Sequence, residues 1–238
     1  MHKNSYVFFF AAIVTLSCSI LLAAAANLLR DRQQENIALD IRKNILASAE
    51  LGSEEMTRQE VLRLYDKYIR SKVINLEGEE VPDKTVEQLD PRKDLNLLPL
   101  YYAEEDGEIM AYILPISGKG LWSTIYGYIA LEKDLNTVMG ITFYQHGETP
   151  GLGAEIDKEW FTSNFKGKKI LSPEGDLVSI TVIKGKVKQF IPEDEAYHYV
   201  DGISGSTLTC RGLNKFLKND LETYKPFFDK IRNEGMEQ

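Results

Sequence analysis

The sequence predicts an α+β protein, with a single N-terminal transmembrane helix followed by a domain in which helices flank an antiparallel sheet. Three observations support this prediction. An uncharged apolar run lies near the N-terminus, short segments of alternating hydrophobicity fill the middle, and an amphipathic helical pattern closes the chain. We place an anchor at residues 1–32, a helical and mixed juxtamembrane region at 33–100, and the principal domain at 101–238.

The predicted anchor is the run from Tyr6 to Leu29, which contains no charge, glycine or proline. At ~1.5 Å per residue this run reaches about 36 Å as a helix, enough to cross a ~30 Å hydrocarbon core. The alternative is a cleaved signal peptide, because the small residues 23–26 resemble a cleavage site. The length of the run and the helical sequence that continues over 30–50 favour a retained anchor in the lipid bilayer.

Two further helices are predicted before the sheet. Apolar residues four apart predict a juxtamembrane helix over 27–50, which Gly52 and Ser53 end. Thr57, with Glu60 three residues on, has the pattern of a capping box and starts the second helix. A short strand over 73–80 and a loop over 82–99 follow.

Beyond residue 101 the pattern is typical of strands. We expect strands over 108–116, 122–131 and 137–145, of which the last two form a hairpin, and a second hairpin of 178–184 with 186–190. A short helix is expected over 160–165. A closing amphipathic helix, which Pro226 should kink or interrupt, is defined by Leu208, Leu213, Phe216, Leu217, Leu221 and Tyr224.

The bulk composition narrows the class of function. The formal net charge is −8, which argues against a nucleic-acid partner because such proteins present a basic face. The two cysteines, Cys18 and Cys210, lie in different predicted regions and imply no disulfide framework, and the three histidines show no metal-ligand spacing. We therefore expect no metal site carried by this chain alone.

The most informative stretch runs from Asp201 to Thr209. It packs two glycines, two serines and two threonines between an acid and an apolar helix, and such a run predicts a tight, open turn that presents a hydroxyl group. The alternative is a turn that merely caps the helix, since serine and threonine are routine N-caps.

Two other runs stand out. Residues 146–155 form a rigid loop, in which Pro150 fixes φ and Gly151 and Gly153 leave backbone open to a flat ligand; the alternative is a plain connecting loop. Residues 118–127 hold Trp122, which either stacks near a ligand or belongs to the core. Gly118-x-Gly120 lacks the third glycine and the βαβ context of a dinucleotide fingerprint.

Together, these three runs and the anchor resemble the NqrC family, the C subunits of the sodium-translocating NADH:quinone oxidoreductase. The turn is similar to the flavinylation motif Asp-x-x-Ser/Thr-Gly-Ala-Thr, whose last threonine carries FMN through a phosphoester; here that residue is Thr207, and Ser206 stands where the family usually has alanine. The G subunit of the Rnf complex shares the anchor and this motif. The Leu121-Trp122-Ser123 run and the long segment before it favour the NqrC family.

The resemblance implies an FMN-binding domain over 101–238, with Thr207 as the covalent acceptor. A phosphate at Thr207 would lie at a helix start, where free amides and the helix dipole favour an anion. Gly202 and Gly205 would let backbone approach it and Arg211 would pair with it. The further residues expected to contact the flavin are Trp122, Glu148, Thr149, Leu152, Gly153, Asp201, Ser204, Ser206 and Leu208.

The function that the resemblance implies is electron relay, in which the flavin carries the redox chemistry, so we expect no catalytic acid or base in this chain. A flavin transferase would attach FMN, which would pass electrons from NADH-derived centres towards quinone within a six-subunit, sodium-pumping complex of the bacterial inner membrane. The resemblance also implies that the domain lies in the periplasm. The Lys/Arg count by itself favours the cytoplasm instead. The alternatives are a G-type subunit of an Rnf complex, a stand-alone membrane-anchored flavoprotein, and a non-redox anchored binding domain.

Overall fold

The computed structural model describes residues 4–53, 55–90 and 92–236, and the chain divides into two compact units, residues 1–40 and 41–238. Helix α1 (Asn4–Ser48) supplies the described part of the first unit and its last turns belong to the second. Within the first unit, the side chains of 4–38 are exposed, and the most apolar window of α1 has a mean hydropathy of 2.5. The helix is therefore long and apolar enough to cross a membrane, and the helical continuation predicted beyond residue 30 is confirmed.

The second unit is built on a five-stranded antiparallel meander whose strands follow sequence order. The strands are β1 (Ile69–Asn75), β2 (Leu97–Glu105), β3 (Glu108–Lys119), β4 (Thr124–Glu132) and β5 (Val138–Gln145). The predicted hairpin of β4 and β5 is confirmed, whereas the strand predicted over 73–80 starts at 69 and ends at 75. The sequence analysis missed β2, because Pro99 cannot donate to a ladder and masks the strand pattern.

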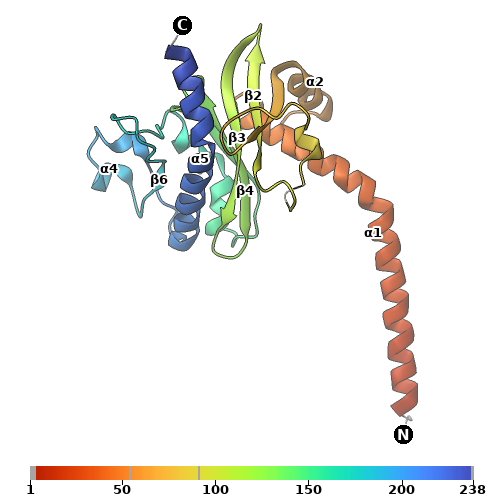
Figure 1. The fold of residues 1–238 in the computed structure, drawn as a ribbon. Helices are drawn as coiled ribbons and strands as arrows, with labels where there is room; N and C mark the ends of the chain where they lie inside the picture. Colours follow the sequence, from red (N-terminus) through yellow and green to blue (C-terminus); the bar gives the residue numbers. More distant parts are fainter. Residues whose placement is uncertain (1–3, 54, 91, 237–238) are drawn as a thin grey trace. The chain divides into compact units, whose positions relative to one another are not determined.

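Helices cover both faces of this sheet, as Figure 1 shows, with α5 (Thr207–Met236) on one side and α2 (Arg58–Tyr68) and the last turns of α1 on the other. Alternation along β3 turns Tyr112 and Leu114 towards the main core, and Ile113 towards the opposite face. All three are buried, so β3 lacks the polar face of a half-exposed strand. The predicted capping box at the start of α2 is confirmed, because the Thr57 amide donates to Glu60 Oε2 at 2.9 Å and the Glu60 amide donates back to Thr57 Oγ1 at 3.4 Å.

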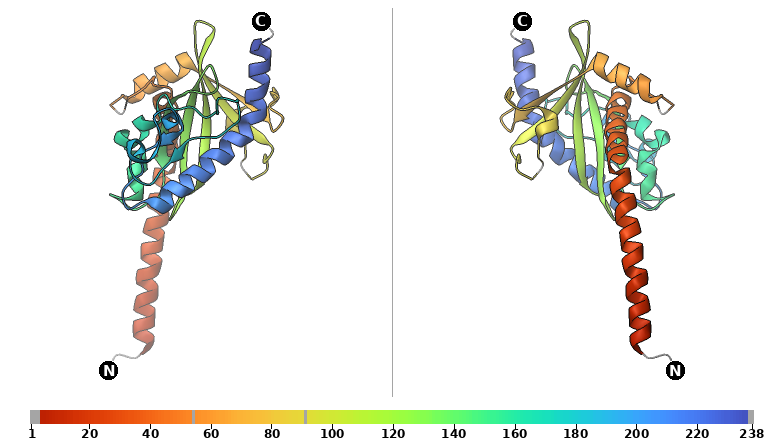
Figure 2. Two further views of the ribbon diagram at one scale, coloured as in Figure 1. Left: turned by 90° about the vertical axis from the view of Figure 1, so that its left-hand side faces the viewer. Right: turned by 90° about the vertical axis from the view of Figure 1, so that its right-hand side faces the viewer.

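Helix α5 packs against β3 and continues through Pro226. Figure 2 shows that it changes direction along its length, as an internal proline makes a helix do, so the kink is observed without an interruption. Phe227 and Phe228 are buried beyond the proline, and the Tyr224 hydroxyl donates to the Pro99 carbonyl at 2.6 Å. These contacts hold both parts of the helix on the sheet.

The prediction of a second hairpin about Gly185 is wrong. The strand β6 (Thr181–Val182) pairs in parallel with β7 (Tyr199–Val200), and the segment after Gly185 forms the short helix α4 (Val187–Phe190). The Asn214 side chain of α5 bonds both the amide and the carbonyl of Val182, at 2.8 and 2.9 Å, and so occupies that edge of β6. The helix predicted over 160–165 is confirmed as α3 (Glu159–Thr162) with a 3₁₀ turn (Ser163–Phe165).

Four 3₁₀ turns complete the described elements. They are η1 (Val86–Gln88), η2 (Gly153–Asp157), η3 (Ser163–Phe165) and η4 (Ala196–His198). Of these, η2 follows the loop after β5 and carries the buried side chain of Ile156 into the main core, which ties that loop to the rest of the domain.

The contact between α5 and the end of β3 is expected to make stability pH-dependent. Burial raises the pKa of Asp220 from 3.8 to about 6, although its Oδ2 accepts from the Ser117 amide at 2.7 Å. A folded pKa above the unfolded one means that stability is lost as the pH rises through 6. Asp220→Asn keeps the acceptor and should therefore be more stable by about 1–2 kcal/mol at pH 8, with little difference at pH 4.

Urea unfolding at both pH values measures this effect. The matched control is Glu222→Gln, which neutralises an exposed carboxylate on the same helix and should change stability by less than about 0.5 kcal/mol. An Asp220→Asn effect of the same size at pH 4 and pH 8 would contradict the assignment to titration of this carboxyl group.

Candidate functional site

Three loops meet at a cavity of about 200 Å³ beside the start of α5. One loop joins β3 to β4, the second follows β5, and the third leads into α5. These are the three runs that the sequence analysis singled out. The cavity is lined by Leu121, Trp122, Glu148, Thr149, Leu152, Gly153, Gly205, Ser206 and Thr209.

The carboxylate of Glu148 joins these loops. Its side chain is 5% exposed and accepts the amides of residues 121, 122 and 123, at 3.3, 2.9 and 3.2 Å. It also accepts the hydroxyl of Thr209, in the first turn of α5, at 2.7 Å. One buried carboxylate therefore holds the β3–β4 loop, the loop after β5 and the helix in register.

The same contacts keep Glu148 ionised. Burial by itself would raise its pKa, but the hydrogen bonds from the Thr209 hydroxyl and the three amides outweigh burial and hold the pKa of Glu148 below its usual value. From the sequence, Glu148 is expected to contact the flavin. In the structure its acceptor capacity is taken up by protein donors, so its part in the cavity is to position the loops around it.

Two glycines make this arrangement possible. A Cβ atom on Gly120 would lie 2.6 Å from Glu148 Oε1, and one on Gly153 would lie 2.7 Å from Thr209 Oγ1. Any larger residue at either position would push the carboxylate off its donors. Gly153, which was expected to leave backbone open to a ligand, is buried against the Glu148–Thr209 pair.

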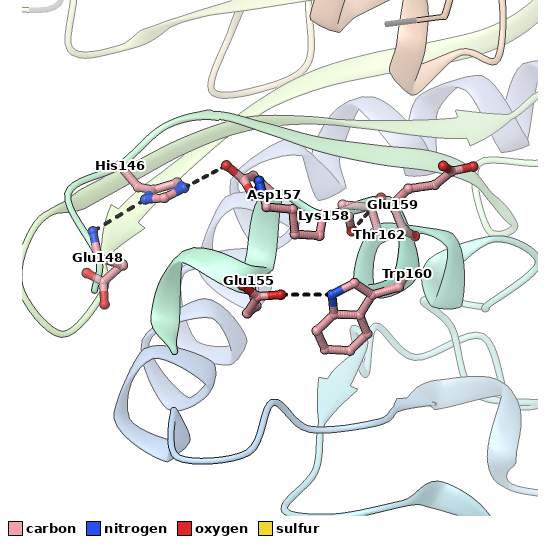
Figure 3. A network of polar contacts seen from close by, with 8 residues as sticks. All are labelled: His146, Glu148, Glu155, Asp157, Lys158, Glu159, Trp160 and Thr162. Atoms are coloured by element: carbon pink, nitrogen blue, oxygen red, sulfur yellow. Dashed lines mark hydrogen bonds and ion pairs between the residues drawn. The ribbon is translucent and has the colours of Figure 1, made fainter. Parts of the chain in front are cut away.

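A further set of polar contacts supports the loop after β5 (Figure 3). The His146 ring accepts the Glu148 amide at 3.3 Å and bonds Asp157 Oδ2 at 3.2 Å through its other nitrogen. The Trp160 indole donates to Glu155 at 3.0 Å. These bonds fix both ends of the segment that carries Glu148, which preorganises the cavity wall.

The turn before α5 presents its hydroxyl groups unequally. Thr207, the first residue of α5, is exposed, whereas Ser206 is 3% exposed and Thr209 is 1% exposed. The first amides of a helix have no acceptor within the helix, and together with its dipole they favour an anion at this end. Gly205 has φ +76°, and a Cβ there would lie 2.7 Å from the Leu152 side chain. Thr207 is therefore the accessible hydroxyl at an anion-favouring position.

Two residues of the sequence motif lie away from the cavity. Asp201 accepts the Val187 amide at 2.7 Å and pairs with Lys186 at 3.0 Å. Burial opposes ionisation of Asp201, but these partners lower its pKa. A Cβ on Gly202 would lie 2.0 Å from the Ile183 carbonyl oxygen, so Gly202 allows backbone packing there. Both residues hold the 183–187 segment against the turn, and neither lines the cavity.

The remaining predicted residues lie at the surface around the turn. Ser204, Leu208 and Arg211 are exposed, and Leu208, at 54%, does not join the buried face of α5. Trp122 is 66% exposed and precedes β4, so the alternative of a core tryptophan is excluded. The apolar side chains of Leu121, Trp122 and Leu152 therefore form an open rim around the cavity.

Leu121 and Thr209 line the cavity but were not predicted from the sequence as site residues. Helix geometry could have indicated that Thr209 is buried, because the side chains of residues two apart in an α-helix point about 200° apart. If Thr207 faces outwards, Thr209 faces the core, and there a hydroxyl needs a buried partner. No sequence signal identified Glu148 as that partner, because the two positions lie far apart in the chain.

Comparison with known proteins gives the class first. Residues 120–222, which contain all three loops, match the family model of the FMN-binding domain. The cavity thus belongs to an FMN-binding domain carried on a long apolar N-terminal helix. A solved structure of the C subunit of the Na⁺-translocating NADH-quinone reductase from Parabacteroides distasonis has the same fold, with a TM-score of 0.73, 35% identity, and coverage of 84% of this chain and 96% of that one.

Whole-chain relatives give the particular family. The C subunit of the Na⁺-translocating NADH-quinone reductase from Pseudomonas aeruginosa is 40% identical over 231 residues, 87% of each chain. The corresponding protein from Yersinia pestis is 34% identical over 92% of this chain and 90% of that protein. The chain belongs to the NqrC family, the C subunits of the Na⁺-translocating NADH-quinone reductase. The likeness confirms the resemblance stated from the motifs and favours NqrC over the Rnf G-type alternative.

Proposed function

We propose that this chain is an electron-transfer subunit whose FMN is esterified to Thr207 and relays electrons from NADH-derived centres towards quinone. The observation that carries the proposal is the pairing of an exposed threonine at the start of α5 with a cavity built from all three family motifs. The relatives' names support a multi-subunit, sodium-translocating oxidoreductase, and we infer that this chain assembles with the other subunits of such a complex.

The residues present fit FMN. The helix start suits the phosphate, the apolar rim of Leu121, Trp122 and Leu152 suits the flat ring, and Thr149 offers polar groups to the ring edge. At about 200 Å³ the cavity is smaller than the ~300–1,000 Å³ typical of ligand pockets, so part of the flavin would stay exposed. A covalent bond removes the need for a deep pocket, and an exposed ring can meet a donor and then an acceptor.

Attachment of FMN to the chain would be a phosphoryl-group transfer with no redox change. A flavin transferase would bring FAD, whose FMN phosphorus would form a bond to Thr207 Oγ1 as its bond to the AMP oxygen breaks. AMP would leave with the bridging oxygen, and the threonine proton would neutralise it. The bound flavin then supplies the electron chemistry, and the chain's own residues hold and orient it.

The length and apolar composition of α1 support attachment of the chain to a membrane. We propose that its apolar part anchors the chain once in the bacterial inner membrane and that the FMN-binding domain faces the periplasm. Digestion of spheroplasts by an added protease should remove the domain while intact cytoplasmic markers survive. A domain that is protected until the membrane is lysed would contradict this orientation.

Intact-mass measurement tests the proposed function. Chain coexpressed with a flavin transferase should gain the mass of one FMN less one water, and the band should fluoresce in a denaturing gel. Peptide mapping should place the addition on Thr207. A chain that stays unmodified and colourless under these conditions would refute the covalent assignment and leave a non-redox binding domain as the better account.

A further inference from the structure

Among the buried side-chain hydroxyl groups of the described residues, one that lines the cavity has no partner. The side chain of Ser206 is 3% exposed, and its hydroxyl has no hydrogen-bond partner in the part of the chain that the structure describes. Buried hydroxyl groups in native proteins nearly always have a partner. Ser179 is also buried and unpaired, but among these two serines Ser206 alone lines the cavity.

The backbone keeps this hydroxyl where it is. The Ser206 amide donates to the Ile203 carbonyl at 3.2 Å, and the Ser206 carbonyl accepts the Cys210 amide at 3.0 Å, so both sides of the residue are fixed. The neighbouring carboxylate of Glu148 already accepts four protein donors. The cavity, which Leu121 and Leu152 also line, therefore has a buried hydroxyl donor that the protein does not satisfy.

We propose that the Ser206 hydroxyl donates a hydrogen bond to the polar edge of the isoalloxazine ring of bound FMN. This inference rests on the proposed function. The ring, and not the phosphate, is the partner because the Thr207 ester lies at the exposed start of α5, where helix amides serve the phosphate. The cavity that Ser206 lines is also lined by the apolar side chains of Leu121, Trp122 and Leu152, which suit a ring face, and the ring edge carries nitrogen and carbonyl acceptors.

This hydrogen bond would change the reduction potential of the flavin. Reduction adds negative charge to the ring edge, and a buried donor stabilises that charge more than it stabilises the oxidised ring. Ser206, at the position where the family usually has alanine, therefore raises the reduction potential of this flavin relative to an alanine-bearing cavity.

Ser206→Ala in the full-length, detergent-solubilised and flavinylated chain tests the inference. We expect covalent flavin at the wild-type level, shifted absorption maxima and a lower reduction potential. The matched control is Thr223→Ala, which removes an exposed hydroxyl from α5 that does not line the cavity and should leave both readouts unchanged. A Ser206→Ala protein with wild-type spectrum and potential would overturn the inference.

Thermal unfolding provides a second test. In flavin-free chain made with Thr207→Ala, the Ser206→Ala change should raise Tm, because it removes an unpaired buried hydroxyl. In flavin-loaded chain the same change should lower Tm, because it removes a bond to the ring. The same direction in both would show that the serine acts only on the protein. A wild-type chain without flavin after coexpression with the transferase would instead refute the proposed function itself, and the inference with it.

Discussion

Replacement of Thr207 by alanine is expected to abolish covalent flavin completely. Thr207 is the exposed hydroxyl at the start of α5, whereas the neighbouring Ser206 is 3% exposed and its hydroxyl is not accessible to an attaching enzyme. Alanine is a good helix former, so the variant should fold with a stability within about 0.5 kcal/mol of wild type. The measurement is flavin fluorescence of the denatured band together with intact mass.

The control for this experiment is Thr223→Ala, because Thr223 is an exposed threonine of the same helix that does not line the cavity, and its loss should not affect loading. Thr209→Ala is a poorer control, since its hydroxyl is a buried donor to Glu148 at 2.7 Å. Retained fluorescence in Thr207→Ala would move the acceptor to another hydroxyl and contradict the assignment.

Replacement of Glu148 by alanine is expected to have the largest effect on stability. It would leave three amides and the Thr209 hydroxyl without their acceptor in a buried site. Loss of a buried group with several charged hydrogen bonds costs about 3–5 kcal/mol. Urea unfolding of flavin-free chain measures this loss, and flavin loading should fall because the cavity walls lose their common anchor.

The pH dependence distinguishes this role from simple packing. Glu148 has a folded pKa below its ordinary value of 4.5, so its contribution is complete above that value and is lost as the pH falls towards the folded pKa. Glu148→Gln should remove that part of the acid sensitivity and cost about 1–3 kcal/mol at pH 7.

The matched control is Glu155→Ala, which removes a carboxylate of the same segment whose side chain has one described donor, Trp160, at 3.0 Å. It should cost less than about 1 kcal/mol. Equal losses for Glu148→Ala and Glu155→Ala would contradict the central place of Glu148.

Local rules explain which elements the sequence predicted correctly. The capping box of Thr57 and Glu60, the hairpin of β4 and β5 and the α5 helix each depend on residues close together in the chain. The prediction failed where distant partners intervene. The Asn214 side chain occupies an edge of β6, and the Val187 amide bonds Asp201, so the segment after Gly185 becomes a helix.

The same division holds for the site. The amino-acid order was enough to predict the long apolar helix and the three motif loops, because composition and spacing carry that information, and the acceptor threonine stays a prediction. Only the tertiary structure shows that Glu148 is the common acceptor and that Thr209 donates to it. It also shows that Trp122 lies at the surface and that the Ser206 hydroxyl is unpaired. Burial and hydrogen-bond pairing depend on which distant segments meet, and no local pattern records that.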